Sequence, residues 1–405
     1  MKKKVLLLAG EESGVIYARQ IAARLADGAE IRGYADYGFK TEDLAVMGIW
    51  PVLARLFFFL GVRRTMRRAI ASWRPDLVIT VDYPGMNMSL AAYAKKLGLK
   101  TMHVVSPQVW AWKKRKIPVV ERTFDRLCCF LPFEPKCYRD GFAVFTGHPL
   151  YDAFCGVKEQ AREDGLVAVL PGSRMFEIEN LMPVLCAAMD ILGNGARVSG
   201  LGSRVAGRGS RETASMDKAT LDPRPEPRNP RFVIPAANAR VRAAIERHLS
   251  SCACAKGLVK VVDGGAREIL SKATCAVVAS GTATLEAALA KCPTVLVYRV
   301  SAFTAFFLRL MIKGTRHAGL ANILWARCGG SGEQPMPELL QENCTPEKVA
   351  VHLSRWLDDP EERARCVGRL EAATSFLRTG EDAMARIAEE ASSLLSAAAS
   401  NETEA

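Results

Sequence analysis

The sequence lacks the histidine and cysteine groupings that hold metal ions in most metalloproteins. It has five histidines among 405 residues, and its twelve cysteines include no C-x-x-C pair. The nearest cysteine groupings are Cys128-Cys129 and Cys252-Ala253-Cys254, a spacing that predicts no zinc site. We therefore expect no metal, and free buried thiols of this kind are typical of a reducing compartment.

The N-terminus lacks an export signal of ordinary length. Three lysines precede the apolar residues 5–9, as in a signal peptide, but this apolar run ends at Gly10-Glu11-Glu12. Signal peptides need a longer apolar region, so a first β-strand explains these residues better. We expect a cytoplasmic protein.

An uninterrupted apolar run of membrane-spanning length is also missing. The segment Ala45–Arg68 comes nearest, but Gly48, Pro51 and Arg55 interrupt it and four arginines close it. A surface helix with aromatic side chains in lipid and arginines on lipid phosphates fits this pattern. A buried helix with a solvated basic end fits it as well. The first interpretation assigns to the membrane Trp50, Leu56, Phe57, Phe58, Phe59, Arg63, Arg64, Arg67 and Arg68.

What is present is a globular composition with an excess of positive charge. Apolar residues make up 49% of the chain and charged residues 24%, and the net charge is +12. Such an excess could serve nucleic acid, an anionic membrane or a phosphorylated substrate. A chain of 405 residues is longer than a single hydrophobic core usually supports, so we expect two domains.

Short apolar runs recur along the chain, and a glycine turn or a polar turn follows each of them. Near-continuous apolar runs of this kind are typical of parallel strands that helices cover on both faces. The clearest runs lie at residues 5–9, 77–81, 166–170 and 275–279. The pattern predicts an α/β protein with two Rossmann-like, doubly wound domains facing across a cleft.

The turn Gly147-His148-Pro149 marks the end of the first domain. We expect domains at residues 1–160 and 161–344, followed by C-terminal helices and a tail at 345–405. Residues 192–231 are rich in glycine, serine and arginine without a clear period, which predicts a flexible basic insertion.

Two turns of the second half have the chemistry of an anion site. Ser280-Gly281-Thr282 precedes a helix, whose first N–H groups are unpaired and carry partial positive charge. Arg174 ends the turn Pro171–Arg174 and could bind a phosphate through two hydrogen bonds. An ordinary capped helix would have the same turn pattern, and Glu286 could either support that cap or accept hydrogen bonds from sugar hydroxyls.

Asp82 follows the apolar run at 77–81 and therefore lies at the carboxyl end of a predicted strand. Ligands of open parallel sheets bind beyond these ends, so a carboxylate there is well placed for chemistry. An Asx turn or helix cap is the alternative explanation. Ser13, in the first glycine loop, could likewise cap a helix or contact a ligand.

Seven segments together resemble the lipid-A-disaccharide synthase family and occur in that family's order. They cover most of the chain outside the insertion. They read A-G-E-E-S-G at 9–14, L-A-V-M-G-I at 44–49, V-D-Y-P-G-M-N at 81–87, S-P-Q-V-W-A-W at 106–112, F-L-P-F-E at 130–134, L-P-G-S-R at 170–174 and S-G-T-A-T-L-E-A-A-L-A-K-C-P at 280–293.

This resemblance implies a GT-B glycosyltransferase fold and a hexosyltransferase of lipid A biosynthesis. The family transfers diacylglucosamine from its UDP derivative to diacylglucosamine 1-phosphate with inversion, which forms a β-1',6-linked disaccharide and releases UDP. It works at the inner face of the Gram-negative inner membrane, on an anionic surface, and needs no metal or organic cofactor. Nucleic acid is not a partner, and family members suggest a homodimer formed through the C-terminal helices.

The resemblance also implies roles for individual residues. Asp82 matches the first aspartate of a family motif, and we assign it as the base that deprotonates the acceptor. The donor would be bound by Gly172, Ser173, Arg174, Ser280, Gly281, Thr282, Glu286 and Asn322. The acceptor side of the cleft would hold Glu11, Ser13, Gly14, Asn87, His103 and Ser106.

Three departures from the family pattern keep other functions open. Val15, Gly85 and Ala321 stand where the family usually has aspartate, aspartate and proline. A UDP-sugar 2-epimerase would have similar domains and glycine turns without needing a membrane-facing patch. A non-catalytic, membrane-associated protein that binds UDP-sugars would keep the patch and tolerate the departures.

Overall fold

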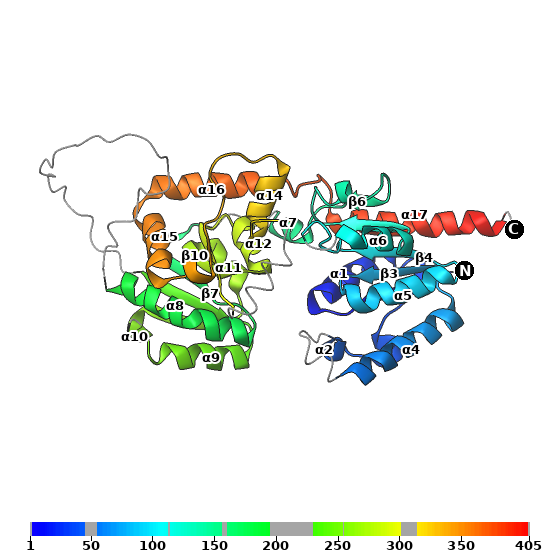
Figure 1. The fold of residues 1–405 in the computed structure, drawn as a ribbon, viewed down its shortest axis with the longest axis horizontal. Helices are drawn as coiled ribbons and strands as arrows, with labels where there is room; N and C mark the ends of the chain where they lie inside the picture. Colours follow the sequence, from blue (N-terminus) through cyan, green and yellow to red (C-terminus); the bar gives the residue numbers. More distant parts are fainter. Residues whose placement is uncertain are drawn as a thin grey trace, which may run out of the picture. The chain divides into compact units, whose positions relative to one another are not determined.

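The computed structural model describes residues 2–44, 55–111, 114–155, 160–194, 230–253, 255–300 and 314–403. The chain divides into two compact units. Unit 1 comprises Met1–Cys155, Met311–Thr315 and Phe376–Ala405, and unit 2 comprises Gly156–Leu310 and Arg316–Ser375. Each unit is a six-stranded parallel sheet with helices, which confirms the predicted α/β fold of two doubly wound domains (Figure 1).

In unit 1 the strand order is β2-β1-β3-β4-β5-β6. The strands begin and end as follows: β1 Lys3–Ala9, β2 Ala29–Arg32, β3 Leu77–Val81, β4 Lys100–Val104, β5 Arg126–Cys129 and β6 Ala143–Phe145. The helices are α1 (Glu12–Leu25), α2 (Thr41–Leu44), α4 (Leu56–Trp73), α5 (Pro84–Lys96), α6 (Ile117–Thr123), α7 (Pro149–Phe154) and α17 (Ala383–Thr403), with short 3-10 turns at Ala35–Tyr37, Lys114–Lys116 and Pro135–Cys137.

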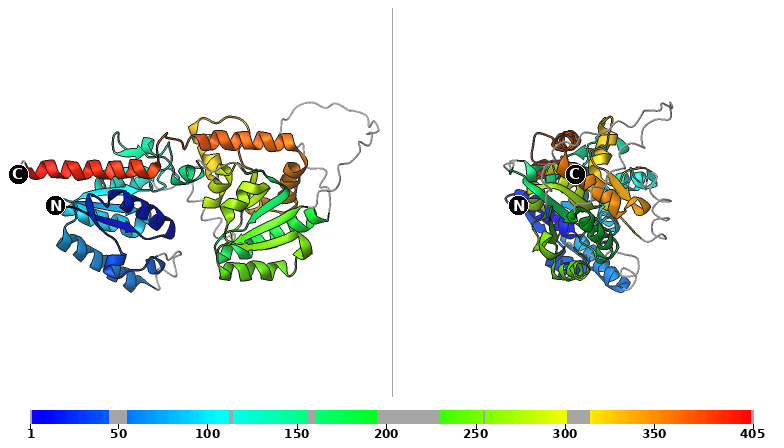
Figure 2. Two further views of the ribbon diagram at one scale, coloured as in Figure 1. Left: turned by 180° about the vertical axis from the view of Figure 1, so that it is seen from behind. Right: turned by 90° about the vertical axis from the view of Figure 1, so that its left-hand side faces the viewer.

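Alternation along β1 shows how the unit 1 sheet is covered on both faces. Side chains of a strand point to opposite faces in turn, and all of β1 from Val5 onward is buried. Val5 and Leu7 pack in a cluster with α1 and α17, whereas Leu6 and Leu8 pack in another with α4 and α5. Accordingly, α17 lies on one side of this sheet and α4 with α5 on the other (Figures 1 and 2).

In unit 2 the strand order is β12-β11-β10-β7-β8-β9. The strands are β7 Glu163–Leu170, β8 Arg231–Ala236, β9 Val259–Asp263, β10 Ala273–Ala279, β11 Thr294–Tyr298 and β12 Glu338–Leu340. The helices are α8 (Met175–Gly193), α9 (Ala239–Leu249), α10 (Ala255–Leu258), α11 (Ala266–Lys272), α12 (Thr282–Leu289), α14 (Leu320–Cys328), α15 (Pro346–Asp358) and α16 (Pro360–Ser375), with a 3-10 turn at Gln341–Asn343. One hydrophobic core joins this sheet to α8, α9, α15 and α16.

Two boundaries differ from those expected. The predicted C-terminal region 345–405 is shared, because α15 and α16 belong to unit 2 while α17 buries Met384 and Ile387 in the core of unit 1. The predicted insertion 192–231 is shorter at both ends, because α8 continues to Gly193 and β8 begins at Arg231. Its residues 195–229 lie outside the described part of the chain, as does Trp50.

Within the described ranges, no helix combines the length and apolarity needed to cross a membrane. The eleven cysteines in these ranges are free, and most of them are buried. The same ranges hold no group of histidine, cysteine, aspartate and glutamate side chains suited to a metal ion.

Candidate active site

A pocket of about 290 Å³ lies at the carboxyl ends of β7, β8 and β10 in unit 2. This is the edge where ligands of parallel sheets bind. Six predicted donor-binding residues meet there, because both glycine turns open into it. The lining comprises Leu170, Gly172, Ser173, Arg174, Glu177, Pro235, Ala236, Ala237, Gly264, Ala266, Ala279, Ser280, Gly281, Thr282 and Ala283.

Glu177 holds the turn that presents Arg174. Its buried carboxylate accepts hydrogen bonds from the backbone N–H groups of Ser173 (3.1 Å) and Arg174 (3.2 Å) through Oε2, and its Oε1 lies 3.4 Å from the Arg174 guanidinium. Gly172 has a φ of +108°, and a Cβ there would collide with Oε2 of Glu177. The start of α8 is therefore capped by a carboxylate of its own, and Arg174 is the group this turn offers to an anion.

The turn before α12 is arranged differently. Gly281 is the N-cap, with a φ of +152°, and no side chain forms a cap hydrogen bond to this helix end. The hydroxyl of Thr284 instead donates to the Gly281 carbonyl at 2.8 Å. The Thr284 N–H also donates to the Gly281 carbonyl at 3.1 Å, so among the described residues the N–H groups of Thr282 and Ala283 are the ones left beside a pocket that Arg174 also lines. These N–H groups and Arg174 both favour an anion.

Two further donor-side predictions fall elsewhere in unit 2. Glu286 lies on α12, half-buried, and burial raises the pKa of its carboxyl while nearby Arg267 lowers it. It is absent from the described residues that line the pocket. Asn322 is fully buried, and its amide donates to the Met336 carbonyl (2.8 Å) and to Glu338 (2.7 Å) while accepting from the Met336 N–H (3.0 Å). The Asn322 amide therefore joins α14 to the segment before β12.

Sequence reasoning missed Glu177, which lines the pocket, and Tyr298, which interacts electrostatically with two residues of that lining. Glu177 carries a recognisable signal, because a glutamate three residues after an N-cap is typical of a capping box. Tyr298, the last residue of β11, carries no such signal. Burial raises the pKa of its hydroxyl, and Glu177 and Arg174 are the charged groups that act on it.

In unit 1, Asp82 lies at the carboxyl end of β3, as predicted. Its N–H donates to the Val104 carbonyl at 2.9 Å, and partial burial raises the pKa of its carboxyl, opposed by the Tyr83 N–H. Asp82 and Tyr83 have φ values of +48° and +50°. Consecutive non-glycine residues in the left-handed region store strain, and such strain clusters at functional sites.

Gly10 and Tyr83 determine how this strained turn packs. The ring of Tyr83 lies against Gly10, where any Cβ would collide with it. The Tyr83 hydroxyl donates to the Leu44 carbonyl at 3.1 Å. Neither residue was among those predicted for the site, because a contact between positions 10 and 83 has no local sequence pattern.

The predicted residues of the first glycine loop lie at the start of α1. Glu11 is the N-cap of α1, and Ser13 is exposed within the first turn. The alternative prediction that Ser13 caps this helix is therefore wrong. Gly14 is buried, and a Cβ there would be in ordinary contact with the Val81 carbonyl, 3.5 Å away. Val15, one of the departures from the family pattern, packs partly buried against the core formed with α1 and α17.

The other predicted acceptor residues are buried and bonded inside unit 1. The Asn87 amide accepts from the Tyr34 hydroxyl (3.0 Å) and donates to the carbonyls of Leu8, Val81 and Asp82. Ser106 is bonded to the Tyr138 hydroxyl at 3.1 Å. These contacts support the strand ends that carry Asp82.

His103 is buried between the sheet and α6. Its Nδ1 is 2.7 Å from the Thr80 hydroxyl, and its ring stacks on Phe124. Burial lowers the pKa of this imidazole to about 4, so it is neutral at physiological pH. A neutral ring with no opening to solvent supports β4 rather than exchanging protons with a substrate.

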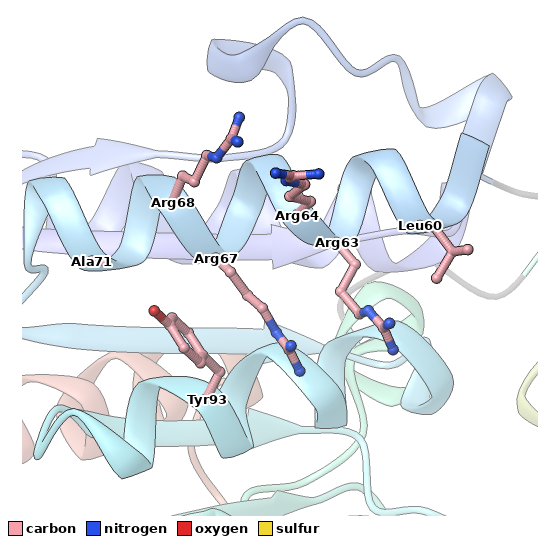
Figure 3. Close-up of a pocket in the computed structure, with 7 residues that line it drawn as sticks. All are labelled: Leu60, Arg63, Arg64, Arg67, Arg68, Ala71 and Tyr93. Atoms are coloured by element: carbon pink, nitrogen blue, oxygen red, sulfur yellow. The ribbon is translucent and has the colours of Figure 1, made fainter. Parts of the chain in front are cut away.

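From Leu56 onward the predicted membrane segment belongs to α4, and the aromatic residues of this part divide between surface and core. Phe57 is 87% exposed, and Leu56 is exposed beside it. Phe58 and Phe59 instead pack partly buried against the core between α4 and the sheet, where Phe58 meets Phe39 edge to face. The four arginines of the segment line an open groove of about 470 Å³ on the outward side of α4 (Figure 3).

Almost the whole chain matches one protein family. A sequence profile of the lipid-A-disaccharide synthetase family matches residues 5–201 and 201–391. The chain belongs to this family. The lipid-A-disaccharide synthase of Anaeromyxobacter dehalogenans (strain 2CP-C) is 33% identical to it, covering 96% of both chains. That of Klebsiella pneumoniae (strain ATCC 700721) is 34% identical, covering 88% of both.

Solved structures show the same fold at low sequence identity. The calicheamicin glycosyltransferase CalG4 has a TM-score of 0.57 at 14% identity, covering 98% of both chains. MurG from Acinetobacter baumannii has a TM-score of 0.55 at 13% identity, covering 96% of this chain and 98% of its own. These structural similarities show that the chain has the GT-B fold, which the sequence resemblance to the lipid-A-disaccharide synthase family had predicted.

Proposed function

We propose that this chain is an inverting glycosyltransferase that moves diacylglucosamine from its UDP derivative to the 6-hydroxyl of diacylglucosamine 1-phosphate, forming the lipid A disaccharide 1-phosphate and UDP. The observation that carries the proposal is membership of the lipid-A-disaccharide synthetase family along almost the whole chain. The GT-B fold and the anion-binding character of the unit 2 pocket agree with it.

On the donor side, the unit 2 pocket would receive the diphosphate of the UDP-sugar. Negative charge builds up on this group as the bond to the sugar breaks, and donors that are already oriented stabilise that charge best. Arg174 is held by Glu177, and the N–H groups of α12 are fixed in a helix. We assign both to the leaving diphosphate, and Glu286 and Asn322 remain predicted donor-side residues.

On the acceptor side, Asp82 would take the proton of the attacking hydroxyl. A general base works best when its pKa lies near the working pH, and burial moves the pKa of Asp82 in that direction. Glu11, Ser13 and Gly14 begin α1 and would contact the acceptor. Asn87, His103 and Ser106 would act from beneath, by supporting the strand ends.

The acylated substrates require access to a membrane surface. We propose that the exposed Leu56 and Phe57 enter lipid at the cytoplasmic face of the inner membrane while the α4 arginines meet anionic head groups. Such binding is peripheral. Self-association through the C-terminal helices remains part of the proposal.

The deciding experiment mixes the purified protein in detergent with UDP-diacylglucosamine and diacylglucosamine 1-phosphate and follows the products by mass spectrometry. A tetra-acylated disaccharide monophosphate that requires both substrates is the expected result. An isomerised UDP-sugar formed without acceptor would instead indicate the epimerase. If UDP bound and no product formed with several acyl lengths, the chain would be a non-catalytic UDP-sugar-binding protein.

A further inference from the structure

The outward face of α4 changes character along its length. Residues three or four positions apart share one side of a helix. The first turn presents Leu56, Phe57 and Leu60, all at least 40% exposed. The following turns present an open groove lined by Leu60, Arg63, Arg64, Arg67, Arg68, Ala71 and, from α5, Tyr93.

Figure 3 shows the arginines projecting from two sides of α4. Arg64 and Arg68 point to one side, whereas Arg63 and Arg67 point to the other, toward α5. Leu60 lies at one end of this row of arginines and the small residue Ala71 at the other. All four arginines nevertheless contribute to the lining of the same open groove.

No carboxylate neutralises this charge among the described residues. Neither α4 nor α5 contains an aspartate or a glutamate, and none of the four arginines forms an ion pair within the described chain. Elsewhere in unit 1, Arg24, Arg32 and Arg126 are all paired with acidic side chains. Four arginines around one groove, without an ion pair among the described residues, repel each other, and a bound anion would relieve that repulsion.

Arg67 is held in place before any ligand arrives. Its guanidinium lies 5.2 Å from the centre of the Tyr93 ring and donates to the Ser89 hydroxyl at 3.4 Å. Its buried Nε has no hydrogen-bond partner among the described residues. A side chain fixed in this way loses less conformational entropy when it binds a ligand.

We propose that this groove is a discrete binding site for the phosphomonoester head group of a membrane lipid. The inference rests on the proposed membrane-associated function and gives it a specific ligand chemistry. A phosphomonoester has three terminal oxygens and close to two negative charges near neutral pH, so it satisfies several guanidinium groups where a phosphodiester satisfies fewer. With the phosphate between the arginines, acyl chains would extend beside Leu60, Phe57 and Leu56.

The groove uses residues separate from those assigned to catalysis. Its lining comes from the bodies of α4 and α5, whereas Asp82 belongs to the turn after β3. Head-group binding and transferase chemistry can therefore be measured independently.

The test measures binding of the full-length protein to phosphatidylcholine vesicles that contain either phosphatidic acid or phosphatidylglycerol at equal surface potential. We expect the wild type to prefer phosphatidic acid. The variants R63Q/R67Q and R64Q/R68Q should each lose that preference, with binding to phosphatidic acid weakened about fivefold or more per arginine. The control R115Q/K116Q removes two exposed charges of the 3-10 turn Lys114–Lys116, outside the groove, and should keep it.

Several results would overturn the proposal. Equal binding to both lipids by the wild type would indicate a diffuse surface charge, as would equal losses in all three variants. The groove would be a site for free phosphate if inorganic phosphate bound as tightly as soluble dihexanoyl phosphatidic acid. In that case the variant Leu60→Ser would not change the affinity for either ligand. Transferase assays in detergent, run on the same variants, separate this proposal from the proposed function. If the protein bound phosphatidic acid through the groove but had no transferase activity, the proposed function would be refuted and the lipid site would stand.

Discussion

At the scale of single residues, Asp82 carries the most specific prediction. Replacing it with asparagine removes the base but keeps the shape of the strained turn, so turnover should fall by a factor of about 10² to 10⁴. UDP binding should not change, because its proposed site lies wholly in unit 2. Asp140→Asn makes the same chemical change at an exposed loop position and should retain full turnover. Near-normal turnover of the Asp82 variant would remove this residue from the base role.

The pH dependence of turnover tests the same assignment from another direction. Burial raises the pKa of Asp82 above the ordinary aspartate value of 3.8. The base acts only when deprotonated, so kcat/KM should rise with pH through this raised pKa and be lost below it. A pH–rate profile that stayed flat down to the ordinary aspartate range would contradict the expected environment of Asp82.

Glu134 gives a residue-scale prediction about stability. Its buried carboxylate accepts from the Trp110 indole N–H and the Leu131 N–H, both at 3.1 Å, and burial raises its pKa to about 8. The carboxyl of Glu134 has a pKa of 4.5 in the unfolded state and about 8 in the folded state. Between pH 4.5 and pH 8 the folded state therefore binds a proton that the unfolded state has lost. The stabilisation from this proton is full below pH 4.5 and is lost as pH rises toward 8.

The variant Glu134→Gln removes this titration. Glutamine keeps an oxygen for Trp110 but leaves the Leu131 N–H unpaired, which costs about 1–3 kcal/mol. Urea unfolding of wild type and variant across this pH range should therefore show a steeper loss of stability with rising pH in the wild type. Parallel pH profiles would contradict the raised pKa.

At the scale of elements, the turn between β7 and α8 depends on Glu177. Glu177→Ala frees the N–H groups of Ser173 and Arg174 and loosens the Arg174 side chain, so UDP should bind about tenfold more weakly, a loss of roughly 1.4 kcal/mol. Glu179→Ala removes an exposed carboxylate of the same helix, which pairs with Arg247 and His248, and should leave UDP affinity unchanged. Calorimetric titration with UDP measures both.

The elements themselves were predictable where their signals are local. A buried parallel strand is a short apolar run, and a glycine turn follows it directly, so β1, β7 and β10 and their turns could be placed from sequence. The side-chain contacts that join separate segments within each unit are not local. Asn322 reaches Glu338 across 16 residues, and Trp110 reaches Glu134 across 24. Nothing in the local pattern separates Phe57, which is exposed, from Phe58, which packs inward.

At the scale of the whole molecule, α17 packs against a unit whose other elements lie far from it in the sequence, so its packing partner could not be predicted from neighbouring residues. The chain leaves unit 1 after α7, belongs to it again at Met311–Thr315, and returns to it finally from Phe376 onward. In this last segment the Ala383 N–H, at the start of α17, donates to the Asp152 carboxylate at 2.8 Å. The two partners are 231 residues apart. The apolar face of α17 shows that it packs on something, but only the folded chain shows that its partner is the first unit.

The last prediction concerns how the whole protein partitions between water and membrane. Exposed apolar side chains contribute in proportion to the area they bury, so Leu56→Ser with Phe57→Ser should weaken vesicle binding by about 2–4 kcal/mol. Val119→Ser changes another exposed apolar residue of unit 1, on α6, and should have no effect. Vesicle co-sedimentation measures the partition, and turnover in detergent should stay normal because neither residue lies in the sites assigned to substrates. Unchanged sedimentation of the double variant would mean that α4 does not face the membrane, and the arginine groove would then need a soluble ligand.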